Sequence, residues 1–178
     1  MAEASDMMPH AQSEPHIEVH KFHPGVVAGA VFLALVLEVF LPRLLPRGAE
    51  YVELPFLVTL YFGLSRRNPI TGLLLGMIIG LLQDGLTGRL IGLFGLAKTV
   101  VGFGASSIGG RIDVDHPLAR LVLAGLFYLI HEGVLEVAQR LLLGEASAFL
   151  TTHLLLATLL NALLAVLFFP ALDRLRRT

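Results

Sequence analysis

The stretch GLLQDGLTGRLIGLFGLAKTVVGF, residues 80–103, decides how this sequence folds. Its side chains are almost all apolar, yet it carries Asp84 near one end and Lys98 in its middle. An isolated charge at the centre of a bilayer is unfavourable by at least about 2.5–3.5 kcal/mol, whereas paired charges that face a bundle interior are tolerated. The stretch therefore predicts membrane helices whose buried charges face one another.

The composition of the whole chain supports this interpretation. Of its 178 residues, 55% are hydrophobic and 15% are charged, whereas a soluble domain carries about 25% charged residues. The apolar residues form long runs separated by short clusters of Arg, Pro, Gly and Asp, which is typical of a multi-span membrane protein. The net charge of −1 gives no reason to expect nucleic acid binding, and the absence of cysteine excludes disulfides and thiolate metal sites.

Residues 1–23 are predicted to form a polar, mobile cytoplasmic tail, and residues 24–178 the membrane domain. The tail has no basic segment leading into an apolar core, so we do not expect a cleaved secretion signal. It contains four of the seven histidines, but no acidic or cysteine cluster completes a metal site, and we expect neither a metal nor a cofactor. These histidines are His10, His16, His20 and His23.

The apolar runs predict an all-α protein with six transmembrane helices, because a span needs about 20 residues. The second and third runs are short, and could instead form one hairpin that does not fully cross. Asn68 before Pro69, and polar residues before Pro117, indicate helix starts. The predicted spans are residues 26–45, 51–64, 69–84, 90–107, 118–143 and 149–169.

Basic residues predict the orientation of the six spans. One side of the membrane would carry eight Lys and Arg residues and the other side four. The excess places both termini in the cytoplasm, because basic loops are retained there. The larger group is Lys21, Arg66, Arg67, Arg111, Arg120, Arg174, Arg176 and Arg177; the smaller is Arg43, Arg47, Arg89 and Arg140.

Helix rise places several ionisable side chains in the outer half of the predicted bundle. Lys98 and Glu132 fall at similar depth, and we expect Lys98 to pair with Glu132 or Asp84 across adjacent helices. Asp84 could instead be an interfacial residue at a helix end, and Glu136 a local partner of Arg140 four residues on. The predicted buried polar set is Glu38, Asp84, Lys98, Glu132 and Glu136.

Glycines recur on two of the predicted helices. Small residues let helix backbones approach closely in a membrane. The glycines could therefore pack the bundle together or, if they face outward, form a groove for a partner helix. The first set, Gly72, Gly76 and Gly80, continues into Asp84; the second, Gly95 and Gly102, shares a helix face with Lys98.

Motifs for catalysis are not apparent in the sequence. There is no G-x-S-x-G, H-E-x-x-H, Walker loop or G-x-G-x-x-G. His131 and His153 lie on different spans without an obvious acidic partner. The loops are too short for a separate catalytic domain, and we therefore predict a protein that is not an enzyme.

Two segments resemble the bacterial rod shape-determining protein MreD family. They are LVTLYFGLSRRNPITGLLLGMIIGLLQD, residues 57–84, and GLFGLAKTVVGF, residues 92–103. The order and spacing of these pieces carry the resemblance, which extends over residues 26–175. Gly95 and Phe103 replace the Ala and Tyr expected in the second segment, and the His-containing tail has no counterpart in the family.

The resemblance implies a six-span component of the bacterial inner membrane that serves cell elongation. Members of this family work with MreC, with the RodA glycosyltransferase and with its class B penicillin-binding transpeptidase, under the guidance of MreB filaments. Their role is to position or activate the enzymes that build side-wall peptidoglycan, among membrane lipids. The MreD bundle is also similar to the substrate-binding subunits of energy-coupling-factor vitamin transporters.

That similarity supplies an alternative function, a small-molecule-binding subunit of a transporter. Its ligand would occupy an outer-half cavity. The absence of tryptophan and the presence of three tyrosines argue mildly against a site that stacks on vitamins. A protein that handles polyprenyl lipids is a further alternative, since a lysine could hold a phosphate. The expected lining is Glu38, Asp84, Lys98, Tyr128 and Glu132.

Overall fold

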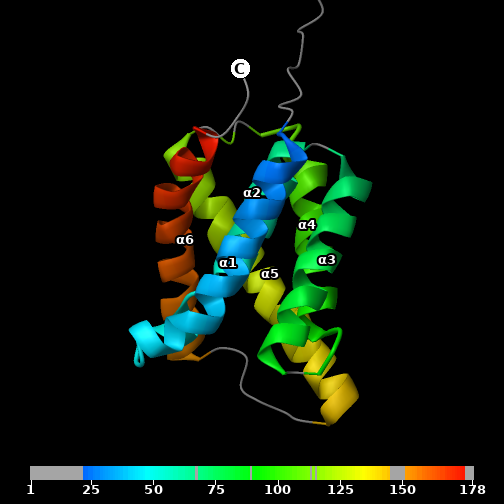
Figure 1. The fold of residues 1–178 in the computed structure, drawn as a ribbon, viewed down its shortest axis with the longest axis vertical. Coiled ribbons are helices and arrows are strands. Elements are labelled where there is room, and N and C mark those ends of the chain that lie inside the picture. Colours follow the sequence, from blue (N-terminus) through cyan, green and yellow to red (C-terminus); the bar gives the residue numbers. More distant parts are fainter. Residues whose placement is uncertain are drawn as a thin grey trace, which may run out of the picture.

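The computed structural model describes residues 22–66, 68–88, 90–112, 114, 116–144 and 151–174. In these residues every regular element is helical, and each predicted span overlaps one α-helix. The helices alternate in direction along the bundle, and the start of α1 (residue 24) and the end of α6 (residue 173) lie at the same end of it (Figure 1). The elements are α1 (Pro24–Leu44), a short 3-10 helix η1 (Ala49–Tyr51), α2 (Leu54–Arg66), α3 (Pro69–Thr87), α4 (Leu93–Ile108), α5 (Pro117–Leu143) and α6 (Thr152–Asp173).

The four long helices begin at a side-chain cap of their own. For α3, the Asn68 side chain accepts hydrogen bonds from the amides of Ile70 and Thr71, with Pro69 in the first turn. Such caps satisfy the amides that a helix start leaves without intrahelical partners. The equivalent caps of α1, α5 and α6 are His23, His116 and Thr151.

The short helix α2 is the centre of the bundle. It contacts each of the other five α-helices, and residues 55–65 are all buried. Its 13 residues extend about 20 Å, far less than the 27-residue α5, which extends about 40 Å. Because α2 is so much shorter than its neighbours, it fills only part of the length of the bundle.

The outer helices expose apolar side chains, as a protein in contact with lipid requires. Phe32 of α1, Ile70 of α3 and Leu167 of α6 are each about 70% exposed. Four helices (α1, α3, α5 and α6) are long and apolar enough to cross a membrane, while α4 is apolar but shorter. Crossing by α2 and α4, and the cytoplasmic location of the termini, stay predictions.

The tightest helix pair is α3 with α4, and glycines form its seam. A Cβ atom built on Gly76 would collide with the backbone carbonyl of Lys98. One built on Gly80 would collide with the carbonyl of Phe94. Gly72 and Gly102 meet in the same way, and Gly95 faces Leu81 and Asp84. The glycine stripe of α3 therefore faces α4, so it is not an outward groove for a partner helix.

Replacing a seam glycine with alanine tests this packing. Gly76→Ala is expected to destabilise the fold by about 1–3 kcal/mol, because an added methyl group overpacks a closed interface. Gly85→Ala on the same helix is the matched control, since a Cβ there has nothing within 4 Å. Thermal unfolding in detergent measures both variants. Equal melting temperatures for the two variants would contradict the packing described here.

Candidate functional site

Lys98 of α4 is fully buried and forms an ion pair with Glu53. Its Nζ lies 2.7 Å from Glu53 Oε1, and the Lys98 side chain has no exposed surface. The ammonium group also lies 4.6 Å from the centre of the Phe94 ring, in a cation–π contact. The structure thus corrects the predicted partner of Lys98, which is neither Asp84 nor Glu132.

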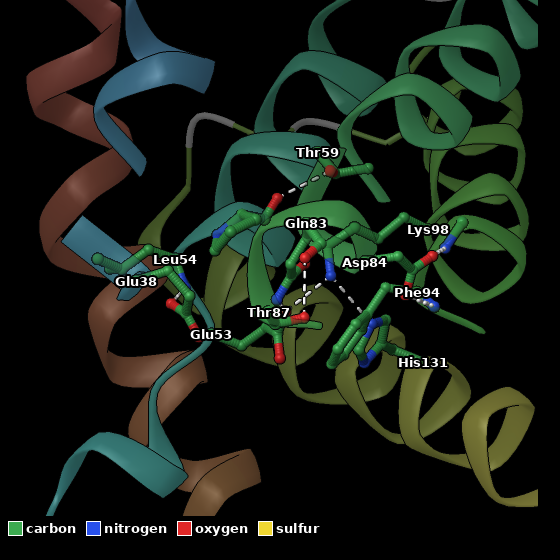
Figure 2. A network of polar contacts seen from close by, with 12 residues as sticks. Glu38, Glu53, Leu54, Thr59, Gln83, Asp84, Thr87, Phe94, Lys98 and His131 are labelled. Atoms are coloured by element: carbon green, nitrogen blue, oxygen red, sulfur yellow. Dashed lines mark hydrogen bonds and ion pairs between the residues drawn. The ribbon is translucent and has the colours of Figure 1, made fainter. Parts of the chain in front are cut away.

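Glu53 connects α4 to two further elements (Figure 2). It lies directly before α2, and its Oε1 also accepts a hydrogen bond of 2.8 Å from Gln83 Nε2 of α3. On the other side, Lys98 Nζ lies 3.3 Å from His131 Nε2 of α5. The buried charge network, defined here as Glu53, Gln83, Lys98 and His131, therefore ties the start of α2 to α3, α4 and α5.

The contacts of His131 indicate its tautomer. An ammonium group can only donate, so in its 3.3 Å contact with Lys98 Nζ the Nε2 atom is the acceptor, which corresponds to the tautomer with a hydrogen on Nδ1. Nδ1 faces Glu132, whose Oε1 is 3.4 Å away. The ring is fully buried and packs against Phe56 and Phe94. His131 therefore links the buried network to a carboxylate on its other side.

Asp84 caps a helix from outside it. Its Oδ2 accepts hydrogen bonds from the amides of Gly92 and Gly95 at 2.8 and 3.1 Å, and Oδ1 accepts one from Phe94 at 3.1 Å. Gly92, the residue before α4, provides no side-chain cap. The Asp84 carboxylate is fully buried, and it satisfies the first amides of α4 and lies at the positive end of the helix dipole. Asp84 therefore lies inside the protein, near the end of α3, where it caps α4.

Glu38 caps the start of α2 in the same way. Its Oε2 accepts a 3.1 Å hydrogen bond from the amide of Leu54, the first residue of that helix. The preceding amide, that of Glu53, donates to Asn161 Oδ1 of α6 at 3.0 Å. Asn161 also donates to the carbonyl of Tyr51 at 2.7 Å. Both short helices therefore begin inside the protein, where side chains of neighbouring helices satisfy their amides.

A cavity of about 740 Å³ opens at the end of the bundle opposite residues 24 and 173. Residues near the end of α1, the end of α5 and the start of α6 surround it, and Glu53 lies at its inner wall. The cavity occupies the axis of the bundle that α2 does not fill. Five glutamates line it, and none of the described lining residues is Lys or Arg. These glutamates are Glu38, Glu50, Glu53, Glu132 and Glu136.

The cavity differs in part from the predicted one. Glu38, Glu132 and Tyr128 line it as expected, whereas the described lining does not include Asp84 or Lys98. Glu136 lines it too, and its Oε1 pairs with Arg140 Nε at 2.6 Å, the local pair expected from their spacing. Among the described residues, no group of three or more His, Asp or Glu side chains could hold a metal ion.

Four residues of the buried site were not predicted from the sequence: Glu53, Gln83, His131 and Asn161. Glu53 lies near the start of the predicted short span, residues 51–64, before the proline at which the helix was expected to begin. The short length of that span could have indicated a buried residue at its end. A helix of 13 residues is shorter than the roughly 20 residues that a membrane span needs, so at least one of its ends would lie below the membrane surface. His131 was set aside for lack of an acidic neighbour, although Glu132 is the next residue in the chain.

A separate polar contact closes the other end of the bundle. Arg120 Nη2 of α5 lies 2.6 Å from Asp173 Oδ2 of α6, and the Tyr61 hydroxyl of α2 donates to Asp173 Oδ1 at 2.9 Å. Arg120 is 5% exposed. This contact fixes α5 and α6 against the far end of α2, so both ends of the central helix are tied to the outer helices.

Comparison with known proteins gives one match. A family model described as rod shape-determining protein MreD matches residues 21–178 of the chain. No curated protein and no solved structure matches it.

Removal of either member of the Lys98–Glu53 pair tests the network. Lys98→Met and Glu53→Gln are each expected to destabilise the protein by about 3–5 kcal/mol, because each leaves a buried charge without its partner. The double variant should lose clearly less stability than the sum of the two single losses, because it leaves no buried charge without a partner. Thermal or denaturant unfolding in detergent measures the three variants.

Arg140→Gln is the control for this cycle. The Arg140 side chain is 48% exposed, and loss of an exposed pair four residues apart changes stability by only about 0.3–0.5 kcal/mol. Strictly additive effects of Lys98→Met and Glu53→Gln would show that the two residues are not coupled.

Proposed function

Since the chain belongs to the MreD family of rod shape-determining proteins, we propose that it is a non-catalytic scaffold that binds MreC in the bacterial inner membrane. Through MreC, or directly, it helps to position or activate the peptidoglycan synthase formed by RodA and a class B penicillin-binding protein. In this proposal it crosses the membrane six times with both termini in the cytoplasm.

The buried charge network supports a scaffold role. Lys98, Glu53 and Gln83 are used to satisfy one another, and Asp84 is used to start α4. The ion pair and hydrogen bonds of a buried network rigidify the elements that they join. The arrangement therefore favours a stiff platform for partner proteins over a reaction centre, which would need reactive groups free to meet a substrate.

The cavity is the single observation that carries the proposed binding site. With both termini in the cytoplasm, its mouth faces the outer surface of the membrane. A partner with a membrane anchor can place the segment next to that anchor in such a mouth. The cavity volume of about 740 Å³ is large enough for several side chains of that segment. We propose that the juxtamembrane part of MreC occupies it.

The alternatives fit less well. A vitamin-binding transporter subunit gains no support from the comparisons. A polyprenyl phosphate would meet five glutamates in the cavity, and the one buried lysine is already paired with Glu53. Like charges in a site of low dielectric repel strongly, so the lining disfavours an anionic ligand.

Filling the cavity tests the proposal. Val52→Trp places a bulky ring in the cavity lining and is expected to abolish co-purification of MreC with the full-length protein in mild detergent. Val122→Trp is the matched control, because Val122 is 58% exposed on the outer face of α5 and should keep MreC bound. Quantitative immunoblotting of MreC against the tagged protein measures the loss.

Two results would contradict the proposal in different ways. If the unaltered protein does not recover MreC, the proposed partner is wrong. If both variants retain MreC, the partner binds but the cavity is not its site.

A further inference from the structure

We propose that the cavity selects its occupant by a basic side chain, a lysine or arginine of the partner segment, which Glu132 and Gln83 recognise. This inference rests on the proposed function, because the segment that presents the side chain is that of the bound partner. The inference adds the chemical group that the cavity recognises in that segment.

Three side-chain donors beneath the cavity are used within the protein, those of Gln83, Lys98 and Asn161. The Gln83 amide nitrogen donates to Glu53 at 2.8 Å. The Lys98 ammonium donates to Glu53 and His131. The Asn161 amide nitrogen donates to the carbonyls of Tyr51 and Ala157. These donors are therefore occupied within the protein and are not available to a ligand.

The side-chain oxygen of Gln83 is a buried hydrogen-bond acceptor without a donor. Gln83 lines the cavity and is 2% exposed, yet its Oε1 has no hydrogen-bond partner among the described residues. The short contact of Nε2 with the Glu53 carboxylate fixes which way the amide points. A buried carbonyl oxygen without a partner is unfavourable by about 1–3 kcal/mol. It marks a position where an incoming N–H group would be stabilised.

Glu132 adds a negative charge to this acceptor. Its side chain is 30% exposed and lines the cavity. His131 Nδ1 lies 3.4 Å from Glu132 Oε1, without a hydrogen bond between them. None of the described residues that line the cavity with Glu132 is Lys or Arg. By contrast, Glu53 is paired with Lys98 and Glu136 with Arg140, so the charge of those two carboxylates is already matched by a cation.

These groups together describe the chemistry of the ligand. It must donate hydrogen bonds, because Gln83 Oε1 and the Glu132 carboxylate are acceptors, and a positive charge complements a cavity lined by five glutamates and, among the described residues, no Lys or Arg. Ammonium and guanidinium groups meet both requirements. A neutral or acidic side chain in the same place would leave the acceptors without partners, and such differences are how a buried polar site gains specificity.

The experiment measures the affinity of purified MreC for the full-length protein in lipid nanodiscs. Glu132→Gln is expected to weaken binding by about thirtyfold or more, as loss of one member of a buried charge pair does. Arg111→Gln is the control, because Arg111 is exposed between α4 and α5 and is not among the residues that line the cavity; it should change affinity less than threefold. Thermal unfolding confirms that each variant is folded.

A charge swap identifies the partner residue. Glu132→Arg should abolish binding, and exchange of one Lys or Arg next to the MreC transmembrane helix for Glu should restore it. If the unaltered protein binds MreC and Glu132→Gln is without effect, the inference is wrong while the proposed function stands. If Glu132→Gln spares MreC but abolishes thermal stabilisation by added putrescine, the site takes a free amine, which also overturns the inference.

Discussion

The buried ammonium group of Lys98 requires an anionic partner inside the protein, because its side chain has no exposed surface. Glu53 supplies that partner at 2.7 Å, and in doing so it holds the start of α2 at a fixed depth. Glu38 and Asn161 then bind the first amides of the same segment. The position of the central helix thus follows from the need to satisfy one charge and two amides in a medium of low dielectric.

The same constraint creates the cavity. Since α2 begins at Leu54 and not at the surface, the axis of the bundle beyond it is lined by carboxylates and open to the outside. The walls are firm, because α3 and α4 are in contact along glycines and the network joins them to α5. A hollow at one end and exposed apolar side chains elsewhere are what the proposed scaffold requires.

Much of the fold could be predicted from the sequence, because hydrophobic runs and proline caps report directly on helices. The bundle-facing side of Lys98 also followed from helical phase. The partner of Lys98, Glu53, could not be predicted in this way. Periodicity places side chains around one helix, but Glu53 lies in a non-helical segment that reaches the core only because α2 is short. The role of Asp84 was not predicted for a related reason. Asp84 belongs to α3 but caps α4, and the two helices are separated by Gly88 and Gly92, both of which have positive φ. The residues of α4 alone contain no signal for such a cap.

The distance between Lys98 and Glu53 in an experimental structure of the protein in a lipid nanodisc tests this account most directly. We expect Nζ of Lys98 to lie within hydrogen-bonding distance of the Glu53 carboxylate, with Gln83 on the same oxygen. A map that shows Lys98 paired with Glu132, or directed toward lipid while Glu53 lies at the membrane surface, would contradict it.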